Sequence, residues 1–205
     1  HCNTHSSFKD KVSMSNLCQE ITLPTTPIQD IHDEQGEIAL CILSAVNVGG
    51  LNDLNELENI CDLSVRALEQ IIDYQDYPVR AAEVSTKKRR SLGIGYIGLA
   101  HYLAKNNVKY SDPKAWELVD RLSEAFQYNL LRASCNIAME KGKCEGFDRT
   151  KYANGLLPID HYKKDVDKIV PHKQRMAWES LRKDIAKYGL RHSTLSAQMP
   201  SESSS

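Results

Sequence analysis

Apolar residues recur at intervals of three or four positions in two long stretches of this chain. The first stretch runs from about residue 53 to residue 74, and its stripe consists of Leu57, Ile60, Cys61, Leu68, Ile71 and Ile72. The second follows residue 112, and its apolar face is marked by Trp116, Val119, Leu122, Phe126 and Leu130. This spacing places side chains on one face of an α-helix. The pattern therefore predicts two long helices, each with one buried face.

The ends of the second stretch carry residues that suit helix termini. Asp112 can accept hydrogen bonds from free backbone N–H groups, and Pro113 at the first helical position has no N–H to leave unpaired. Lys141 and Gly142 supply a cation and a glycine at the other end. We therefore expect one continuous helix between Pro113 and Lys141.

Weaker patterns fill the rest of the chain. Helices are expected over residues 96–105, from about residue 160, and over residues 174–188. Residues 38–48 form a nearly continuous apolar run, typical of a strand covered on both faces in a parallel sheet. Residues 15–23 and 190–199 are predicted to be extended. The order of strand, helices and strand predicts an α/β fold with heavy helical insertions.

Composition narrows the class of protein. The chain has 205 residues, of which 41% are hydrophobic and 26% charged, as in a folded globular domain. Lys and Arg number 26 and Asp and Glu 27, so the formal net charge of −1 provides no field that would attract nucleic acid or a membrane surface. No apolar run approaches the ~20 residues of a membrane span. Six cysteines and no signal-peptide pattern favour a reducing, cytoplasmic location over a disulfide scaffold, with Cys61 and Cys135 as buried apolar side chains.

Three local signals are interpreted as structural. The glycines of Gly93-Ile-Gly-Tyr-Ile-Gly98 match a dinucleotide fingerprint, but the basic run 87–90 precedes them where that fingerprint needs a buried strand. We therefore expect a helix start or close helix packing at these glycines, and a solvated turn at the basic run. His1, Cys2 and His5 lack a second pair of ligands at a suitable spacing, so no metal site is predicted.

The strongest chemical pattern is the triplet Asn16, Cys18 and Glu20. On an extended backbone these side chains point to one side, each about 6.5–7 Å from the next. An amide, a thiol and a carboxylate could then hold a hydroxyl group, form a thiolate or a radical, and act as a general base. The alternative interpretation of this triplet is a structural strand with one buried cysteine and no chemical role. Cys41 lies within the apolar run and is either a second reactive thiol or part of the core.

Six motifs in this order resemble the large, catalytic subunit of class I ribonucleoside-diphosphate reductase. They are the segments 1–6 (HCNTHS), 16–20 (NLCQE), 36–41 (GEIALC), 73–78 (DYQDYP), 89–95 (RRSLGIG) and 195–205 (LSAQMPSESSS). The resemblance covers essentially all 205 residues. It implies a ten-stranded α/β barrel in which a loop carrying the radical cysteine passes through the centre.

The resemblance also implies a role for each matching residue. Cys18 would be the transient thiyl radical that removes the ribose 3′-hydrogen, Glu20 the base for the 3′-hydroxyl proton, and Asn16 the group that holds the ribose hydroxyls. Cys41 would be one half of the redox-active pair. The other substrate-binding residues would be Leu17 and Gln19 beside the radical cysteine, Met199 against the base, and Pro200, Ser201, Glu202, Ser203 and Ser204 around the diphosphate.

The same resemblance sets the expected partners. The substrate would be a ribonucleoside diphosphate, the radical would come from a metal and tyrosyl cofactor in a separate small subunit, and thioredoxin or glutaredoxin would supply electrons. This segment itself would bind no cofactor. ATP and deoxynucleotide effectors, the second redox cysteine, the radical-relay tyrosines and the C-terminal cysteines would lie outside residues 1–205.

Two alternatives to a catalytic fragment of this family remain. The chain starts without Met and stops at a run of serines, so we expect it to be a partial catalytic barrel domain, inactive alone or one piece of a split subunit. A helical interaction module, with the helices at 53–74 and 113–141 as partner surfaces, is the first alternative. A dinucleotide-binding domain is the second.

Overall fold

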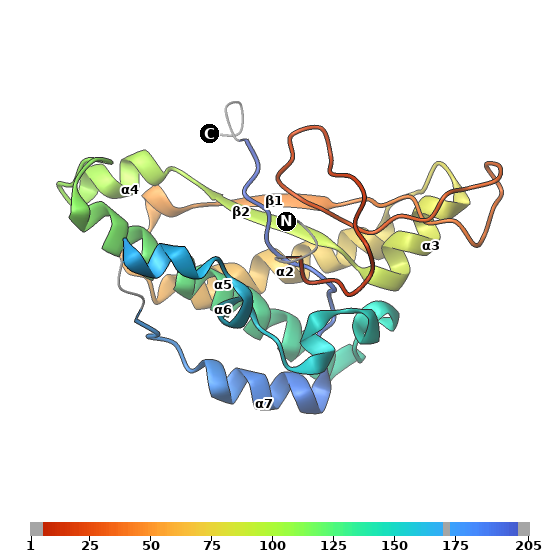
Figure 1. Ribbon diagram of the computed structural model, residues 1–205. Coiled ribbons are helices and arrows are strands. Elements are labelled where there is room, and N and C mark those ends of the chain that lie inside the picture. Colours follow the sequence, from red (N-terminus) through yellow and green to blue (C-terminus); the bar gives the residue numbers. More distant parts are fainter. Residues whose placement is uncertain (1–5, 170–172, 201–205) are drawn as a thin grey trace.

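The computed structural model describes residues 6–169 and 173–200, and its elements alternate between strands and helices in an α/β arrangement (Figure 1). In chain order they are β1 (Ile42–Asn47), η1 (Val48–Gly50), α2 (Glu56–Tyr74), α3 (Arg80–Arg89), β2 (Leu92–Ile97), α4 (Leu99–Lys105), α5 (Pro113–Lys141), η2 (Glu145–Arg149), η3 (Lys151–Asn154), α6 (Pro158–His161), η4 (Lys164–Lys168) and α7 (Trp178–Tyr188).

Two parallel strands separate the molecule into two sides. In β1 and β2, Ile42 pairs with Leu92 and the register continues to Asn47 opposite Ile97. In Figure 1 the long helices lie below the strands, and the segment that precedes β1 loops above them. The segment after α7 continues the sheet beside β2, since Ile94 donates to the carbonyl of Leu195 at 2.8 Å and forms a parallel bridge with Ser196. The expected extended region at 190–199 is thus confirmed in part.

The helices cover only one face of the sheet. Leu92 and Ile94 are fully buried in a core that also contains Leu57 of α2 and Leu122 and Leu130 of α5. Each such side chain contributes about 1.5–3 kcal/mol when it leaves water. The core joins α2, α5 and the lower face of the sheet into one unit.

The opposite face of β1 departs from the prediction. Leu43 is 48% exposed, so the strand is not covered on both faces within the described residues. The strand also starts at Ile42, four residues later than expected. The apolar run at 38–48 shows that this strand is suited to burial on both faces. It does not show which other elements would cover the second face, because those elements are distant in sequence.

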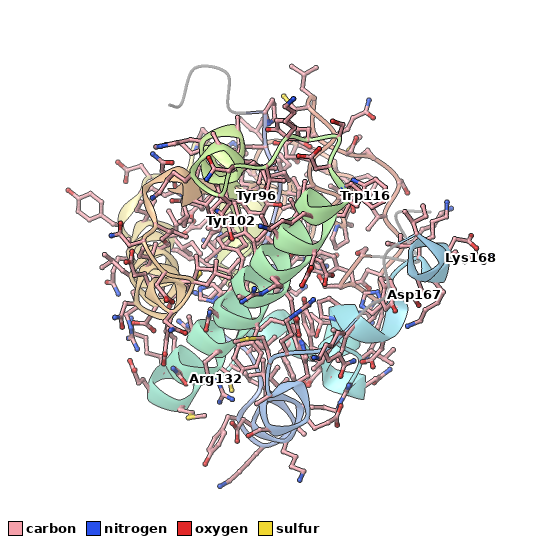
Figure 2. All side chains as sticks on the ribbon, turned by 90° about the vertical axis from the view of Figure 1, so that its left-hand side faces the viewer. Tyr96, Tyr102, Trp116, Arg132, Asp167 and Lys168 are labelled. Carbon is pink, nitrogen blue, oxygen red and sulfur yellow. The ribbon has the colours of Figure 1, made fainter. Side chains whose placement is uncertain are left out.

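The long helix α5 has the predicted ends. It spans Pro113–Lys141, and Gly142 follows with a φ of 84° that favours glycine. Asp112 does not cap the helix as expected, because its carboxylate accepts from the backbone N–H of Lys109 instead, at 2.8 Å. Figure 2 shows α5 crossing the molecule from Trp116 to Arg132, where Arg132 forms an ion pair with Asp184 of α7.

The starts and the buried faces of other helices differ from those that the sequence pattern predicts. Trp116 is 44% exposed and Ile71 is 41% exposed, so each lies at the edge of its apolar stripe. The helix expected at 174–188 starts at Trp178, and the short helix expected from residue 160 starts at Pro158. The polar helix α3 was not predicted, because lysines, arginines and small residues give it no apolar stripe.

The glycine motif lies in a strand, which corrects the expected helix start. Gly93 and Gly95 are inside β2, and only Gly98, with a φ of 76°, forms the turn into α4. The helix predicted from residue 96 therefore begins at Leu99. A dinucleotide fingerprint needs its glycines in the turn after the strand. The motif therefore does not have the arrangement of a nucleotide site.

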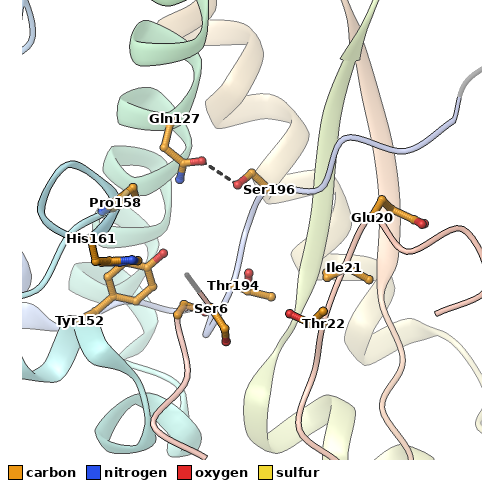
Figure 3. A pocket seen from close by; sticks show the side chains of 11 residues that line it. Ser6, Glu20, Ile21, Thr22, Gln127, Tyr152, Pro158, His161, Thr194 and Ser196 are labelled. Carbon is orange, nitrogen blue, oxygen red and sulfur yellow. Dashed lines mark hydrogen bonds between the residues drawn. The ribbon is translucent and has the colours of Figure 1, made fainter. Parts of the chain in front are cut away.

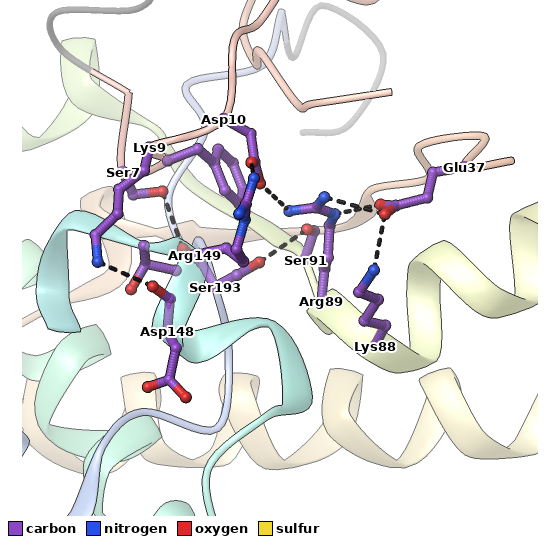
Figure 4. Close-up of polar contacts among 12 residues, drawn as sticks. Ser7, Lys9, Asp10, Glu37, Lys88, Arg89, Ser91, Asp148, Arg149 and Ser193 are labelled. Atoms are coloured by element: carbon purple, nitrogen blue, oxygen red, sulfur yellow. Dashed lines mark hydrogen bonds and ion pairs between the residues drawn. The ribbon is translucent and has the colours of Figure 1, made fainter. Parts of the chain in front are cut away.

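The basic run is also not the solvated turn that was expected. Arg89 ends α3, and Arg90 follows in the left-handed conformation with φ 47° and ψ 49°. Both side chains are buried, with 7% and 5% exposure. Arg89 binds Glu37 and Asp10, which lie in the segment before β1, and Asp10 also binds Arg149 (Figure 4). Buried cations of this kind require carboxylate partners, which the sequence places far away.

Arg90 points the other way, into a carboxylate-centred cluster. Glu69 of α2 is 1% exposed and accepts from Arg90 Nε at 2.7 Å, Arg191 Nε at 2.8 Å and His192 Nε2 at 3.0 Å. Arg90 also binds Asp73, at 2.7 Å. Burial alone raises the pKa of the Glu69 carboxyl, but the hydrogen bonds from His192, Arg90 and Arg191 outweigh it and lower that pKa to about 2.

His192 completes this cluster as a neutral side chain. Its ring is fully buried, and burial lowers the pKa of His192 below its ordinary value although Glu69 opposes that shift. Nδ1 lies 2.9 Å from the hydroxyl of Ser134 on α5, so Nε2–H is left to donate to Glu69. The cluster therefore joins α2, the start of β2, α5 and the segment that leads to residue 200.

Over residues 6–169 and 173–200, no helix combines the length and the apolar character that a membrane span requires.

The first prediction concerns the central carboxylate. Glu69→Gln removes the buried carboxylate that Arg90 and Arg191 share, and it leaves Arg90 with Asp73 as its remaining carboxylate partner. We therefore expect the free energy of unfolding to fall by about 3–5 kcal/mol. Urea denaturation followed by circular dichroism measures this loss. Glu140→Gln removes a carboxylate that also binds an arginine, but at the surface, and should leave the unfolding midpoint almost unchanged. Equal midpoints for the two variants would contradict a central role for Glu69.

The second prediction concerns pH. The unfolded chain takes up a proton at His192 near the ordinary histidine pKa of 6.5, whereas the folded chain resists it, so stability should fall as the pH drops below that value. A further loss should follow between pH 4.5 and about 2 as Glu69 becomes protonated. In His192→Asn the first decline should disappear from the pH profile of the urea midpoint. The exposed His32→Asn should keep it, and a profile unchanged in both variants would refute this assignment.

Candidate functional site

The residues around Cys18 form a tight turn, which corrects the predicted extended arrangement. The N–H of Gln19 donates to the carbonyl of Asn16 at 3.1 Å, and Gln19 has a φ of 61°. The side-chain oxygen of Asn16 accepts from the N–H of Ile21 at 3.3 Å and closes the loop. Asn16, Cys18 and Glu20 therefore do not project as alternate residues of one strand.

The turn presents its tip to the outside. Leu17 is 97% exposed, and Asn16, Cys18 and Gln19 are exposed as well. Glu20 is the exception, because its Oε2 atom is buried and has no hydrogen-bond partner among the described residues. A buried carboxylate oxygen without a donor is able to accept a proton, or a hydrogen bond from a hydroxyl group, of a ligand.

Glu20 and Cys41 belong to one local environment although 21 positions separate them. Cys41 packs against a small apolar cluster that includes Ile21 next to Glu20, as well as Phe8, Leu23 and Ala197. Burial raises the pKa of the Cys41 thiol, and the negative charge of Glu20 raises it further, to about 12. Cys41 therefore keeps its proton near neutral pH. The structure brings together the predicted base and the predicted redox thiol.

The third part of the site comes from the end of the chain. Ala197 joins the cluster around Cys41, and Met199 lies over Gly95 of β2. Pro200 is exposed and follows directly. Residues 197–200 therefore lie on the face of the sheet that the helices leave open, on the same side as the loop at 16–20 (Figure 1). Ser201, Glu202, Ser203 and Ser204 lie outside the described residues.

A polar cavity of about 320 Å³ adjoins this face (Figure 3). Its lining is rich in hydroxyl groups and includes Ser6, Thr22, Thr194 and Ser196, together with Glu20, Gln127, Tyr152 and His161. Ser196 donates to Gln127 at 2.6 Å and so ties the last segment to α5. Glu20 lies at the rim, and its side chain points away from Gln127 and Tyr152 (Figure 3). A lining of this kind can hydrogen-bond a polyhydroxylated ligand.

The remaining candidate ligands do not form a metal site within the described ranges. Residues 6–169 and 173–200 contain no group of three or more His, Cys, Asp or Glu side chains placed to hold a metal ion. His1, Cys2 and His5 lie outside these ranges. Cys61 and Cys135 are fully buried, as predicted.

The structure adds two residues that the sequence analysis did not connect with the site. Gly93 and Gly95 lie on the open face of β2, directly beneath Cys41, Ala197 and Met199. Their alternation with Leu92, Ile94 and Tyr96 is a signal for a strand with one face free of side chains, but the basic residues before it favoured a helix start or close helix packing instead.

Comparisons with known proteins identify the family to which this chain is similar. The family model described as "Ribonucleotide reductase, barrel domain" matches residues 1–205. The chain is 59% identical to the ribonucleoside-diphosphate reductase subunit alpha of Haemophilus influenzae and 54% identical to subunit alpha of reductase 1 of Escherichia coli. The corresponding protein of phage T4 is 43% identical.

These matches include all of this chain for the first two relatives and 96% of it for the third. The chain spans 28%, 27% and 26% of the respective proteins, or about a quarter of their length. Because the family model covers every residue, the chain belongs to the ribonucleotide reductase barrel domain family.

Proposed function

We propose that this chain forms the part of a ribonucleoside-diphosphate reductase large subunit in which ribonucleoside diphosphates are reduced to 2′-deoxyribonucleoside diphosphates by thiyl-radical chemistry. The observation that carries the proposal is the convergence of the Cys18 loop, the Glu20–Cys41 pair and residues 197–200 on one face of the sheet. The relatives named above are alpha subunits of this enzyme, which supports the same reaction class.

The loop residues would begin the reaction. Cys18, as a thiyl radical, would take the hydrogen atom from C3′ of the ribose, and its exposure at the tip of the turn leaves the sulfur accessible to a ligand. Glu20 would accept the 3′-hydroxyl proton through its unpartnered buried oxygen. Asn16 already uses its side-chain oxygen to close the turn, so its amide N–H₂ would bind a ribose hydroxyl.

Cys41 would supply reducing equivalents together with a second cysteine. The 2′-hydroxyl leaves as water, and two thiols become one disulfide, so the atoms and the two electrons balance. The raised pKa of Cys41 supports this role, because a protonated thiol can deliver both a proton and an electron. Thioredoxin or glutaredoxin would then reduce the disulfide.

The phosphate and base would bind at the end of the chain. Residues 200–204 would supply hydroxyl and N–H groups to the diphosphate, while Leu17 and Met199 would offer apolar contacts to the base. The exposure of Leu17 supports such a contact, since a leucine at the tip of a polar loop gains by covering apolar ligand surface.

The rest of the enzyme would come from outside these residues. We infer that β1 and β2 are two of the ten strands of a closed α/β barrel, which would also cover the exposed Leu43. A metal and tyrosyl cofactor in the small subunit would generate the radical. The effectors ATP and deoxynucleotides would bind to other regions of the large subunit.

The radical role of Cys18 can be tested in the full-length subunit. Cys18→Ser should abolish turnover, because a serine hydroxyl does not form the radical, while substrate affinity stays within about twofold. Deoxynucleotide formation and equilibrium substrate binding are the measurements. Cys135→Ala, which removes a buried thiol, should retain activity. Deoxynucleotide production by the serine variant would disprove the assignment.

The redox role of Cys41 has a different kinetic signature. Cys41→Ser should allow at most a limited first turnover and then stop, because the disulfide cannot form. Rapid-quench measurement of product per enzyme, with and without thioredoxin, distinguishes this from a binding defect. Cys144→Ala serves as the control for loss of a buried thiol. Undiminished multiple turnover in Cys41→Ser would exclude the proposed role.

A further inference from the structure

Strand β2 has glycine at two successive positions of the same face. Leu92, Ile94 and Tyr96 pack toward the helices, so Gly93 and Gly95 lie on the open face. Glycine inside a strand lowers stability and gives no side-chain contact, and it often marks a place where another group approaches closely. Neither glycine has a positive φ, so the backbone conformation does not require them.

The group that approaches Gly93 is the thiol of Cys41. A methyl group built on Gly93 would lie 2.5 Å from Sγ of Cys41, 2.7 Å from Cδ2 of Leu43 and 3.1 Å from Cβ of Ala197. Leu43 is half-exposed and its side chain can move away. Cys41 is held between the strand and the cluster that contains Ile21 and Ala197, so its sulfur occupies the space that the missing methyl group leaves.

Gly95 meets a different neighbour. A methyl group there would lie 2.5 Å from the carbonyl oxygen of Ala197 and 2.8 Å from Sδ of Met199. The contact is with the segment before Pro200 and not with the thiol. Both glycines therefore border Ala197, but only Gly93 borders the thiol of Cys41.

We propose that Gly93 is a positioning residue for the Cys41 thiol, and that the absent side chain at this position fixes the place of the sulfur beside Glu20. This inference deepens the proposed function, on which its catalytic consequence rests. The contact between the strand and the sulfur stands independently of that function. A Cβ at position 93 would drive the thiol to another rotamer, away from the half-buried position it occupies.

The first test measures the thiol itself in the full-length subunit. Gly93→Ala should increase the rate of iodoacetamide alkylation at Cys41 about tenfold, because a displaced thiol becomes accessible and ionises more readily. Peptide mass spectrometry reports the rate for each cysteine. Gly50→Ala, where a methyl group meets nothing within 4 Å, should leave the rate unchanged, and Gly95→Ala should alter it much less than Gly93→Ala.

Steady-state kinetics distinguishes a positioning role of Gly93 from a general loss of structure. Gly93→Ala should lower kcat about 10- to 100-fold while KM for the ribonucleoside diphosphate stays within about twofold, because only the reducing thiol moves. Gly50→Ala should preserve both constants. A Gly93→Ala enzyme with unchanged kcat and an unchanged alkylation rate would overturn the proposal.

A double-variant cycle covers the case in which Gly93→Ala folds poorly. In a Cys41→Ala background the sulfur is absent, so Gly93→Ala should lower the thermal midpoint clearly less than it does beside Cys41. Equal losses in both backgrounds would refute the contact. Since this readout needs no activity, a failed redox role for Cys41 would leave the cycle unaffected, and the two failures can be told apart.

Discussion

The fold depends on the burial of two neighbouring arginines at the junction of α3 and β2. Arg89 binds Glu37 and Asp10 on one side, and Arg90 binds Glu69 and Asp73 on the other. Two consecutive buried guanidinium groups can point in different directions because Arg90 adopts the left-handed conformation, which costs roughly 1–2 kcal/mol for a residue other than glycine. The ion pairs with these four carboxylates offset that cost. The junction therefore ties α2 and the segment before β1 to the start of β2.

That junction determines which face of the sheet is available for chemistry. The Glu69 cluster also holds Arg191 and His192, and it fixes the start of the segment that runs beside β2 to residue 200. The helices occupy the other face, so the Cys18 loop, Cys41 and residues 197–200 share the open one. Because Gly93 and Gly95 carry no side chains, Cys41, Ala197 and Met199 lie directly on the strand. Stability and the candidate site thus depend on the same strand through its two faces.

The environment of Cys41 shows how burial and a nearby carboxylate keep a thiol protonated. In a reactive nucleophilic cysteine, nearby cations lower the pKa and the thiolate dominates. Cys41 has the opposite surroundings, with apolar neighbours and the carboxylate of Glu20, and its pKa rises to about 12. The sulfur therefore retains its hydrogen near neutral pH, as the proposed reducing role requires. The same carboxylate has a buried oxygen without a donor among the described residues, which suits it to receive a proton from a ligand.

The sequence by itself determined the elements whose information is local. Proline, glycine and apolar spacing defined α5 from Pro113 to Lys141, and the ordered motifs indicated the family that the comparisons established. Only the tertiary structure decided which charged side chains are buried and where the chain turns. Arg89 and Arg90 of the basic run form a buried junction with carboxylate partners that lie 17 to 79 positions away. The predicted alternation of Asn16, Cys18 and Glu20 is wrong because the Asn16 side chain closes a turn. Long-range ion pairs and loop closure depend on which segments meet in space, and a local pattern contains no information about that meeting.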